Sequence, residues 1–323
     1  MRTKYFASAA LLAVLAVAPR AAADPMDVTL SRLGVDGMGQ CPADGSVPTC
    51  VGDEANYQRL MLQLGNVVAH PVLSPARTLG YRHFYVGLES SVTSIHGPST
   101  QAARNYWSLG TDGGSSATYE QGNLYSESRL PAFRIATRKG LPFGFELGAS
   151  VGRLVHTSNW LWGFELKWSL LEGFRRGGAA FLPDLAVRGT VTGITGTRGF
   201  TMTVPTADVI LSKGFVLGRT LWLTPFVAGQ MVWTIVDSGV VDLSPGSVTD
   251  NDTGANLYVF DKIRAWHPRI AAGFQIQYLH FQLTGAFRYD LGDPSRGLDA
   301  VNGSPNPKMP QQWAVDVGVG VTY

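Results

Sequence analysis

Large apolar residues alternate with small or polar ones along most of the chain after about residue 79. The final segment, WAVDVGVGVTY, shows the pattern most clearly, because every second residue from Trp313 to Tyr323 is apolar or aromatic. A period of two is typical of a strand whose two faces meet different surroundings. The same alternation recurs in LPAFRIATRK, PFGFELGASVG and NWLWGFELKWSL. The chain is therefore predicted to consist mainly of repeated antiparallel strands.

The alternating segments and the turn residues between them predict about ten strands, with twelve as the alternative. Their expected ranges are 82–95, 129–139, 143–155, 159–171, 183–195, 200–212, 220–236, 267–278, 280–291 and 312–323. One segment, DEANYQRLMLQLGNVVA at 53–69, instead has apolar residues at helical spacing behind an acidic start. We expect one helix there and an all-β fold elsewhere.

The face opposite the large apolar residues decides which class of β-protein this is. Gly, Ala, Ser and Thr dominate that face, and only 15% of all residues are charged. A soluble sandwich needs a charged outer face, whereas a transmembrane barrel turns large apolar side chains to lipid and small or polar ones inward. Strands of about 9–11 residues also cross a bilayer when tilted. The pattern favours a transmembrane antiparallel up-and-down β-barrel over residues 79–323.

Residues 1–23 have the composition of a secretory signal peptide. Arg2 and Lys4 precede a short apolar run at 5–18, and three alanines at 21–23 fit the cleavage pattern of signal peptidase. Loss of Arg2, Lys4 and Arg20 with the signal leaves 23 basic residues against 24 acidic ones. The mature chain therefore lacks the basic face that nucleic-acid binding requires.

Residues 24–78 are predicted to form a short periplasmic segment that contains the helix. Cys41 and Cys50 flank a loop with Pro and Gly, and a close pair in an exported chain is most simply one disulfide. The cysteines do not have the spacing of a metal site, and we predict no metal and no cofactor. Because ten strands enclose a narrow lumen, we expect the helix to lay its apolar stripe against the barrel mouth.

The predicted connections differ in length on the two sides of the barrel. If the N-terminal segment is periplasmic, the longest Gly-, Ser-, Asp- and Asn-rich connections all lie outside the cell, at 96–128, 237–266 and 292–311. Most turns on the other side are short. Both chain ends of the barrel then lie on the periplasmic side, as an even number of strands requires.

The signal peptide, the serial alternating strands and the terminal aromatic residue resemble the outer-membrane β-barrel proteins of Gram-negative bacteria. The resemblance covers 79–323 as architecture and 313–323 as a motif. It implies an outer-membrane location and contact with outer-membrane lipids and lipopolysaccharide. It also implies that the barrel-assembly machinery reads an insertion signal in the last strand, which involves Trp313, Val319, Val321 and Tyr323. A fold of this kind does not specify an activity.

Twelve charged residues of both signs fall on the inward face of the predicted strands. They are Glu89, Arg134, Arg138, Glu146, Glu165, Lys167, Arg188, Asp208, Arg269, Arg288, Asp290 and Asp316. Two interpretations remain open. The lumen is crossed by charge pairs that satisfy one another, as buried charges require, or it is a narrow polar conduit or binding site for small solutes.

A short motif, His156-Thr157-Ser158-Asn159, resembles the His-x-Ser-Asn element of outer-membrane lipid hydrolases, the phospholipase and the lipid A deacylase. The resemblance implies His156 as the base and Ser158 as the nucleophile, both near the outer end of a strand. Leu170 stands about where those families place a polar residue that orients the histidine. The same four residues also suit an ordinary turn.

A second enzymatic hypothesis is an omptin-like protease, which is also a ten-stranded type with acids and a histidine above the rim. Its candidates here are His96, His267, Asp290 and Asp293, without a family motif. The inward pattern needs no catalytic role. The sequence therefore favours a conduit or structural barrel, with the lipid hydrolase as the alternative.

Overall fold

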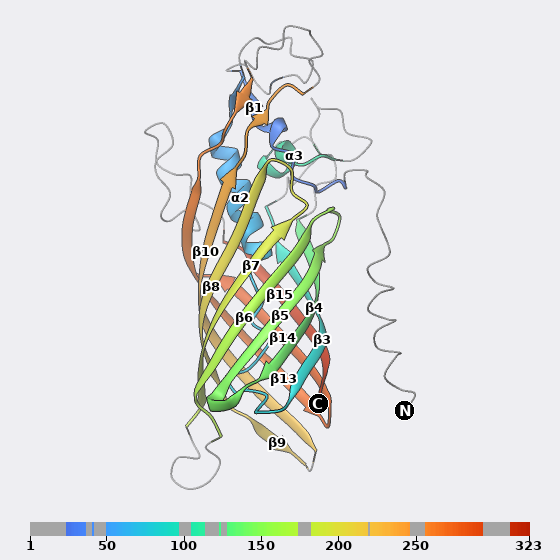
Figure 1. Cartoon of the computed structure of the whole chain (residues 1–323), viewed down its shortest axis with the longest axis vertical. Helices are drawn as coiled ribbons and strands as arrows, with labels where there is room; N and C mark the ends of the chain where they lie inside the picture. The colour runs from blue at the N-terminus through green and yellow to red at the C-terminus, as the bar shows by residue number, and fades with distance from the viewer. Residues whose placement is uncertain are drawn as a thin grey trace.

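Ten antiparallel strands form a closed barrel (Figure 1). The computed structural model describes residues 24–36, 41, 50–96, 105–113, 123, 128–173, 182–218, 220–245, 256–292 and 311–323. The barrel strands are β3 (Phe84–Ser94), β4 (Arg129–Gly140), β5 (Phe145–Leu154), β6 (Trp160–Leu171), β7 (Asp184–Thr195), β8 (Phe200–Ser212), β10 (Leu221–Ser238), β13 (Ile263–Tyr278), β14 (Phe281–Asp290) and β15 (Trp313–Thr322). Neighbours in the chain pair with one another, and β15 pairs with β3 to close the barrel.

The prediction of a ten-stranded all-β barrel is confirmed, and the described strands exclude the twelve-stranded alternative. The largest boundary difference is β13, which begins at Ile263 because it pairs with β10 without interruption as far as Val236. Phe143, which we expected in a strand, instead lies in the short turn η3 (Pro142–Gly144) with a φ of 62°. The short strand β9 (Phe215–Leu217) prolongs the hairpin between β8 and β10.

The outer surface of the barrel is apolar. Exposed side chains alternate with buried ones along every barrel strand, and the exposed ones include Leu88, Phe164 and Val319. Aromatic residues gather near both ends: Trp233 and Trp266 are register partners at one end, and Phe84 stacks on Tyr323 at the other. An apolar belt between two aromatic girdles is the surface that a bilayer requires of a barrel.

The two ends of the barrel differ in what covers them. We call the end with the connections β3–β4, β10–β13 and β14–β15 the loop end, and the opposite end, with Tyr323, the C-terminal end. The loop end carries a cap of short elements: η1 (Leu30–Leu33), β1 (Gly34–Val35), β2 (Val51–Gly52), α3 (Tyr106–Gly110), β11 (Val241–Asp242) and β12 (Leu257–Tyr258). The predicted disulfide between Cys41 and Cys50 is confirmed within this cap.

The one long helix, α2 (Glu54–Val68), lies inside the barrel at the loop end (Figure 1). It begins at Asp53, whose carboxylate accepts a hydrogen bond from the Asn56 amide at 3.1 Å. Its apolar side chains are buried against strands on several sides of the lumen and against α3. This position corrects the expectation of a helix lying against the barrel mouth, since α2 is buried in the lumen.

Small side chains on the helix and the wall explain why the lumen admits a helix about 10 Å across. Gly65 approaches β10 so closely that a Cβ atom there would lie 2.6 Å from the side chain of Thr234. Ala132 and Ala265 face α2 from other strands and are buried. The room for a helix inside the barrel therefore depends on the size of the side chains that line the lumen, and not on the number of strands alone.

Candidate functional site

A non-helical segment, residues 69–83, connects α2 to β3 through the lumen, and we call it the strap. The helix ends at Val68, and Pro71 and Pro75 cannot continue it because proline lacks a backbone N–H. Residues 69–76 are buried in the barrel interior. The strap emerges at the C-terminal end, where β3 begins at Phe84. The lumen is thus occupied by α2 in one half and by the strap in the other.

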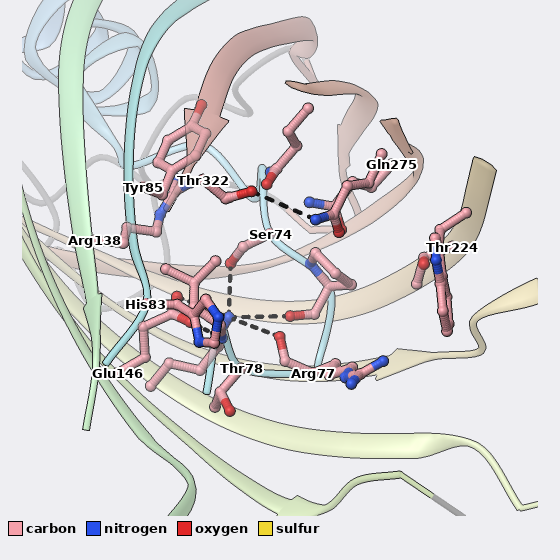
Figure 2. A pocket seen from close by; sticks show the side chains of 16 residues that line it. Ser74, Arg77, Thr78, His83, Tyr85, Arg138, Glu146, Thr224, Gln275 and Thr322 are labelled. Carbon is pink, nitrogen blue, oxygen red and sulfur yellow. Dashed lines mark hydrogen bonds and ion pairs between the residues drawn. The ribbon is translucent and has the colours of Figure 1, made fainter. Parts of the chain in front are cut away.

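Lys167 on β6 holds the lower part of the strap. Its ammonium lies 3.0 Å from Glu146 on β5, and both side chains are buried. The same ammonium donates to three strap oxygens, Ser74 Oγ at 3.3 Å, Pro75 O at 3.2 Å and Arg77 O at 3.4 Å (Figure 2). Lys167 and Glu146 therefore both have partners within the protein.

Arg188 on β7 holds the strap at a second level. Its guanidinium donates to Asp208 at 2.6 Å and to Glu165 at 3.3 Å. It also donates to the carbonyl oxygen of Pro71 at 3.1 Å. Arg188 thus bridges two wall carboxylates and the strap backbone. Its guanidinium neutralises the charges of the carboxylates and also holds the strap in place.

Glu165 links this cluster to Arg138 on β4. Arg138 donates to Glu165 at 2.5 Å and also bonds Glu89 on β3. The strap contributes His70, whose Nε2 lies 3.3 Å from the second oxygen of Glu165. Arg138 further stacks over the ring of Tyr85. Buried charges at this level therefore have opposite charges within hydrogen-bond distance, as their desolvation demands.

At the loop end the wall binds α2 in the same manner. Arg134 donates to the carbonyl of Val68 at 3.0 Å, near the open end of the helix hydrogen-bond ladder. Arg269 pairs with Asp290 at 2.7 Å, and the Asn66 amide donates to Asp290 at 2.9 Å. The helix is thus positioned by polar contacts as well as by its apolar packing.

The structure places all twelve predicted lumen residues inside the barrel, each buried. They are Glu89, Arg134, Arg138, Glu146, Glu165, Lys167, Arg188, Asp208, Arg269, Arg288, Asp290 and Asp316. The sequence did not indicate the strap contacts or Asn66. Its only signal for the strap was a stretch after 69 with two prolines, a loss of helical spacing and no alternation.

A polar cavity of about 320 Å³ opens between the strap and the wall at the C-terminal end (Figure 2). The buried side chains of Lys167 and Glu146 and the half-buried ring of Trp222 on β10 line it. Gln275 on β13 and Gln282 on β14 add amide groups to the wall. This cavity is large enough for a small solute and is lined by buried polar side chains.

The candidate hydrolase residues lie in the turn between β5 and β6 at the loop end. His156 is exposed, with a φ of 59°, and Ser158 is half-buried. The turn binds the N-terminal segment through its backbone: the Met26 amide donates to His156 O at 3.0 Å, and the Ser158 amide donates to Asp27 at 2.7 Å. Leu170 points to lipid and is 41% exposed.

The candidate protease residues are not gathered above the rim. His267 is buried in the barrel wall, with Nε2 3.5 Å from Asp290, because β13 begins before it. His96 is exposed, with Nδ1 3.4 Å from the amide nitrogen of Gln63. Asp293 lies outside the described residues. This arrangement corrects the expectation of a rim cluster.

Two absences hold for the part of the chain that the structure describes. In it, His, Cys, Asp and Glu side chains do not form a group of three or more that could hold a metal ion. None of its helices has both the length and the apolar character needed to span a bilayer.

Glu54 in the first turn of α2 gives the cap a pH dependence. Burial raises the pKa of its carboxyl group, and repulsion from Asp261 and Asp53 adds to the effect. The carboxyl oxygen accepts hydrogen bonds from Tyr258 at 3.0 Å and from the Asp261 amide at 3.1 Å. A raised folded-state pKa stabilises the cap at low pH, and this contribution is lost as pH rises through the folded-state value.

We therefore expect amide protection factors at the start of α2 and in β12 to fall as pH rises through that value. Glu54→Gln keeps the accepting oxygen and removes the titration, so it should flatten the profile. Asp237→Asn, which removes a carboxylate of an exposed pair with Arg264, is the matched control and should leave the profile unchanged. Equal pH profiles for wild type and Glu54→Gln would contradict this assignment.

Three solved structures match most of the chain at low sequence identity and low TM-score. Ail of Yersinia pestis is 8% identical over 75% of this chain and 99% of its own, with a TM-score of 0.25. OprG of Pseudomonas aeruginosa is 9% identical over 76% and 98%, with a TM-score of 0.30. Neisserial surface protein A is 10% identical over 74% and 96%, with a TM-score of 0.27. No family model and no curated protein matches the chain.

The geometry itself identifies the class of protein. The ten strands close without a free edge, the outward side chains are apolar, and buried charges lie inside. This combination satisfies backbone hydrogen bonding in hydrocarbon and turns the apolar face to lipid. The chain has the architecture of a transmembrane β-barrel of the outer-membrane type.

Proposed function

We propose that this protein is a closed barrel that binds small solutes at its C-terminal mouth and does not pass them through the lumen while α2 and the strap are in place. The observation that carries the proposal is the use of the wall charges. Lys167 and Arg188 hold strap carbonyls in addition to their carboxylate partners. A lumen built to conduct would leave such cations lining an aqueous path. A polar cavity of solute size lies at the mouth, next to the strap.

The experiment is single-channel conductance of the refolded protein in planar bilayers. The wild type should give no steady ion current, because helix and strap occupy the lumen. Reversing a wall charge, as in Arg134→Glu, should then leave the current at baseline or destabilise the barrel. Steady wild-type current whose ion selectivity changes with Arg134→Glu would show an open conduit and reject the closed-barrel proposal.

Lipid hydrolysis remains the second candidate because His156 combines exposure at the rim with a positive φ, a backbone state that often marks functional residues. The turn's contacts with Met26 and Asp27 give that conformation a structural reason instead. We therefore expect no ester release from phospholipid or lipopolysaccharide by the purified protein. Release that disappears in both His156→Ala and Ser158→Ala would establish the hydrolase, since base and nucleophile act as one unit.

The partners that we propose follow from the two lipid-facing features. The apolar belt fits outer-membrane lipids and lipopolysaccharide. The segment from Trp313 to Tyr323 fits the role of an insertion signal for the barrel-assembly machinery, because its outward residues are apolar up to the terminal aromatic ring. Export through a signal peptide at 1–23 belongs to the same proposal, and those residues lie outside the described part of the chain.

A further inference from the structure

We infer that the cavity at the C-terminal mouth binds a neutral polyhydroxylated solute of about monosaccharide size. This inference rests on the proposed binding function and adds the chemical class of the ligand. Three features of the cavity carry it: its size, the pairing of its buried charges with partners within the protein, and the neutral groups and the Trp222 ring on its wall.

The cavity has the size and enclosure of a small-molecule site. Its volume is about 320 Å³, at the lower end of the range for ligand pockets. One side is the strap and the other is the wall formed by β10, β13 and β14 (Figure 2). Side chains from separate elements thus converge on one space, as an orientation-specific site requires.

The buried charged groups of the cavity already have partners. Lys167 is bound to Glu146 and to strap oxygens, and the second oxygen of Glu146 accepts the Leu79 amide at 2.9 Å. Arg138 lies between Glu165 and Glu89. An anionic or cationic ligand could engage these groups only by separating buried ion pairs, which is costly. The inner cavity therefore disfavours a charged ligand.

The neutral polar groups of the cavity can form further hydrogen bonds. The side-chain oxygen of Gln282 is buried and has no hydrogen-bond partner among the described residues, and Gln282 is 4% exposed. Gln275 and Thr224 present an amide and a hydroxyl on the same wall (Figure 2). A ligand hydroxyl both donates and accepts, so it can donate to Gln282 and accept from a neighbouring amide.

An aromatic ring completes the site. Trp222 is half-buried and lines the cavity, and a flat ring suits the C–H face of a sugar ring. Arg77 lies over the Trp222 ring at 5.7 Å and is exposed at the rim. Arg77 is the cation through which an anionic ligand could bind, so a test must separate its contribution from that of Gln282.

The experiment is isothermal titration calorimetry of the refolded full chain, at matched ionic strength, with glucose, glucuronate, glucosamine and inorganic phosphate. We expect glucose to bind more tightly than the three charged probes. Gln282→Ala should weaken glucose binding at least tenfold, and Arg77→Ala should change it less than twofold. Gln311→Ala removes an exposed amide at the loop end and is the matched control, with no expected change.

Three other outcomes would contradict, in turn, the ligand class, the binding function and the location of the site. Tighter binding of glucuronate or phosphate that is lost in Arg77→Ala would refute the neutral-ligand inference while leaving a solute-binding barrel. Absence of heat with all four probes, for a protein with the heat-modifiable mobility of a folded barrel, would reject the binding function itself. Glucose binding that Gln282→Ala leaves intact would show that the ligand lies elsewhere and overturn the assigned site.

Discussion

Replacing Val319 and Val321 together by Asp should abolish recovery of the folded barrel from the outer membrane. Val319 is 54% exposed on the lipid face of β15, and β15 closes the barrel by pairing with β14 and β3. Basic residues on the lipid face cost about 2–4 kcal/mol each near the bilayer midplane, acidic ones cost somewhat less, and both costs fall toward the interface near which Tyr323 lies. Two acidic residues on the closing strand lower the barrel's marginal stability and also interrupt the apolar face of the proposed insertion signal. The measurement is the heat-modifiable fraction in outer-membrane preparations.

The conservative variant Val319→Leu/Val321→Ile keeps both side chains apolar and should give normal yield. Deletion of Tyr323 tests whether this residue acts as an insertion signal or contributes to the stability of the folded barrel. Its ring stacks on Phe84, and its backbone exchanges two hydrogen bonds with the same residue. If Tyr323 acts mainly as an insertion signal, the deletion should lower yield in cells more than refolding in detergent. Equal, normal yields for all three variants would eliminate the insertion-signal hypothesis.

The strand positions and the side chains that face the lumen were predictable from the sequence. Successive side chains of a strand point to opposite faces, so an apolar residue at every second position indicates both a strand and the residues that share each of its faces. Once the large apolar face of β6 is assigned to lipid, Glu165 and Lys167 must point inward, whatever the exact boundaries. The same parity argument holds on β14, where Arg288 and Asp290 alternate with exposed residues. An error of two residues in a strand end leaves such an assignment unchanged.

The position of α2 was not predictable from strand number, because the room inside depends on contacts such as that between Gly65 and Thr234. An amphipathic pattern also cannot distinguish a helix on a surface from one in a lumen whose wall carries both alanines and charges. His267 was misplaced for a simpler reason: the alternation of β13 continues four residues before 267, through Arg264 and Trp266, into a segment that we had assigned to a loop.

The second large effect concerns Asp316, which should be among the residues whose loss destabilises the barrel most. Its carboxylate accepts two hydrogen bonds from Arg288, at 2.5 and 2.8 Å, and one from Ser91 at 2.6 Å. All three side chains are buried, and they join β14, β15 and β3 where the barrel closes. Asp316→Ala leaves the Arg288 guanidinium buried without its counter-charge, and breaking such a pair costs about 3–5 kcal/mol.

The double variant Asp316→Ala/Arg288→Met tests whether the charge pair itself provides stability. Removing both charges leaves no unpaired ion, so the double variant should unfold in urea at a midpoint closer to wild type than Asp316→Ala does. The coupling between the two sites is read from a double-mutant cycle. A double variant less stable than either single one would mean that the pair adds little beyond its hydrogen bonds to Ser91. A double variant more stable than the wild type would instead show that this charge pair is retained at a cost in stability.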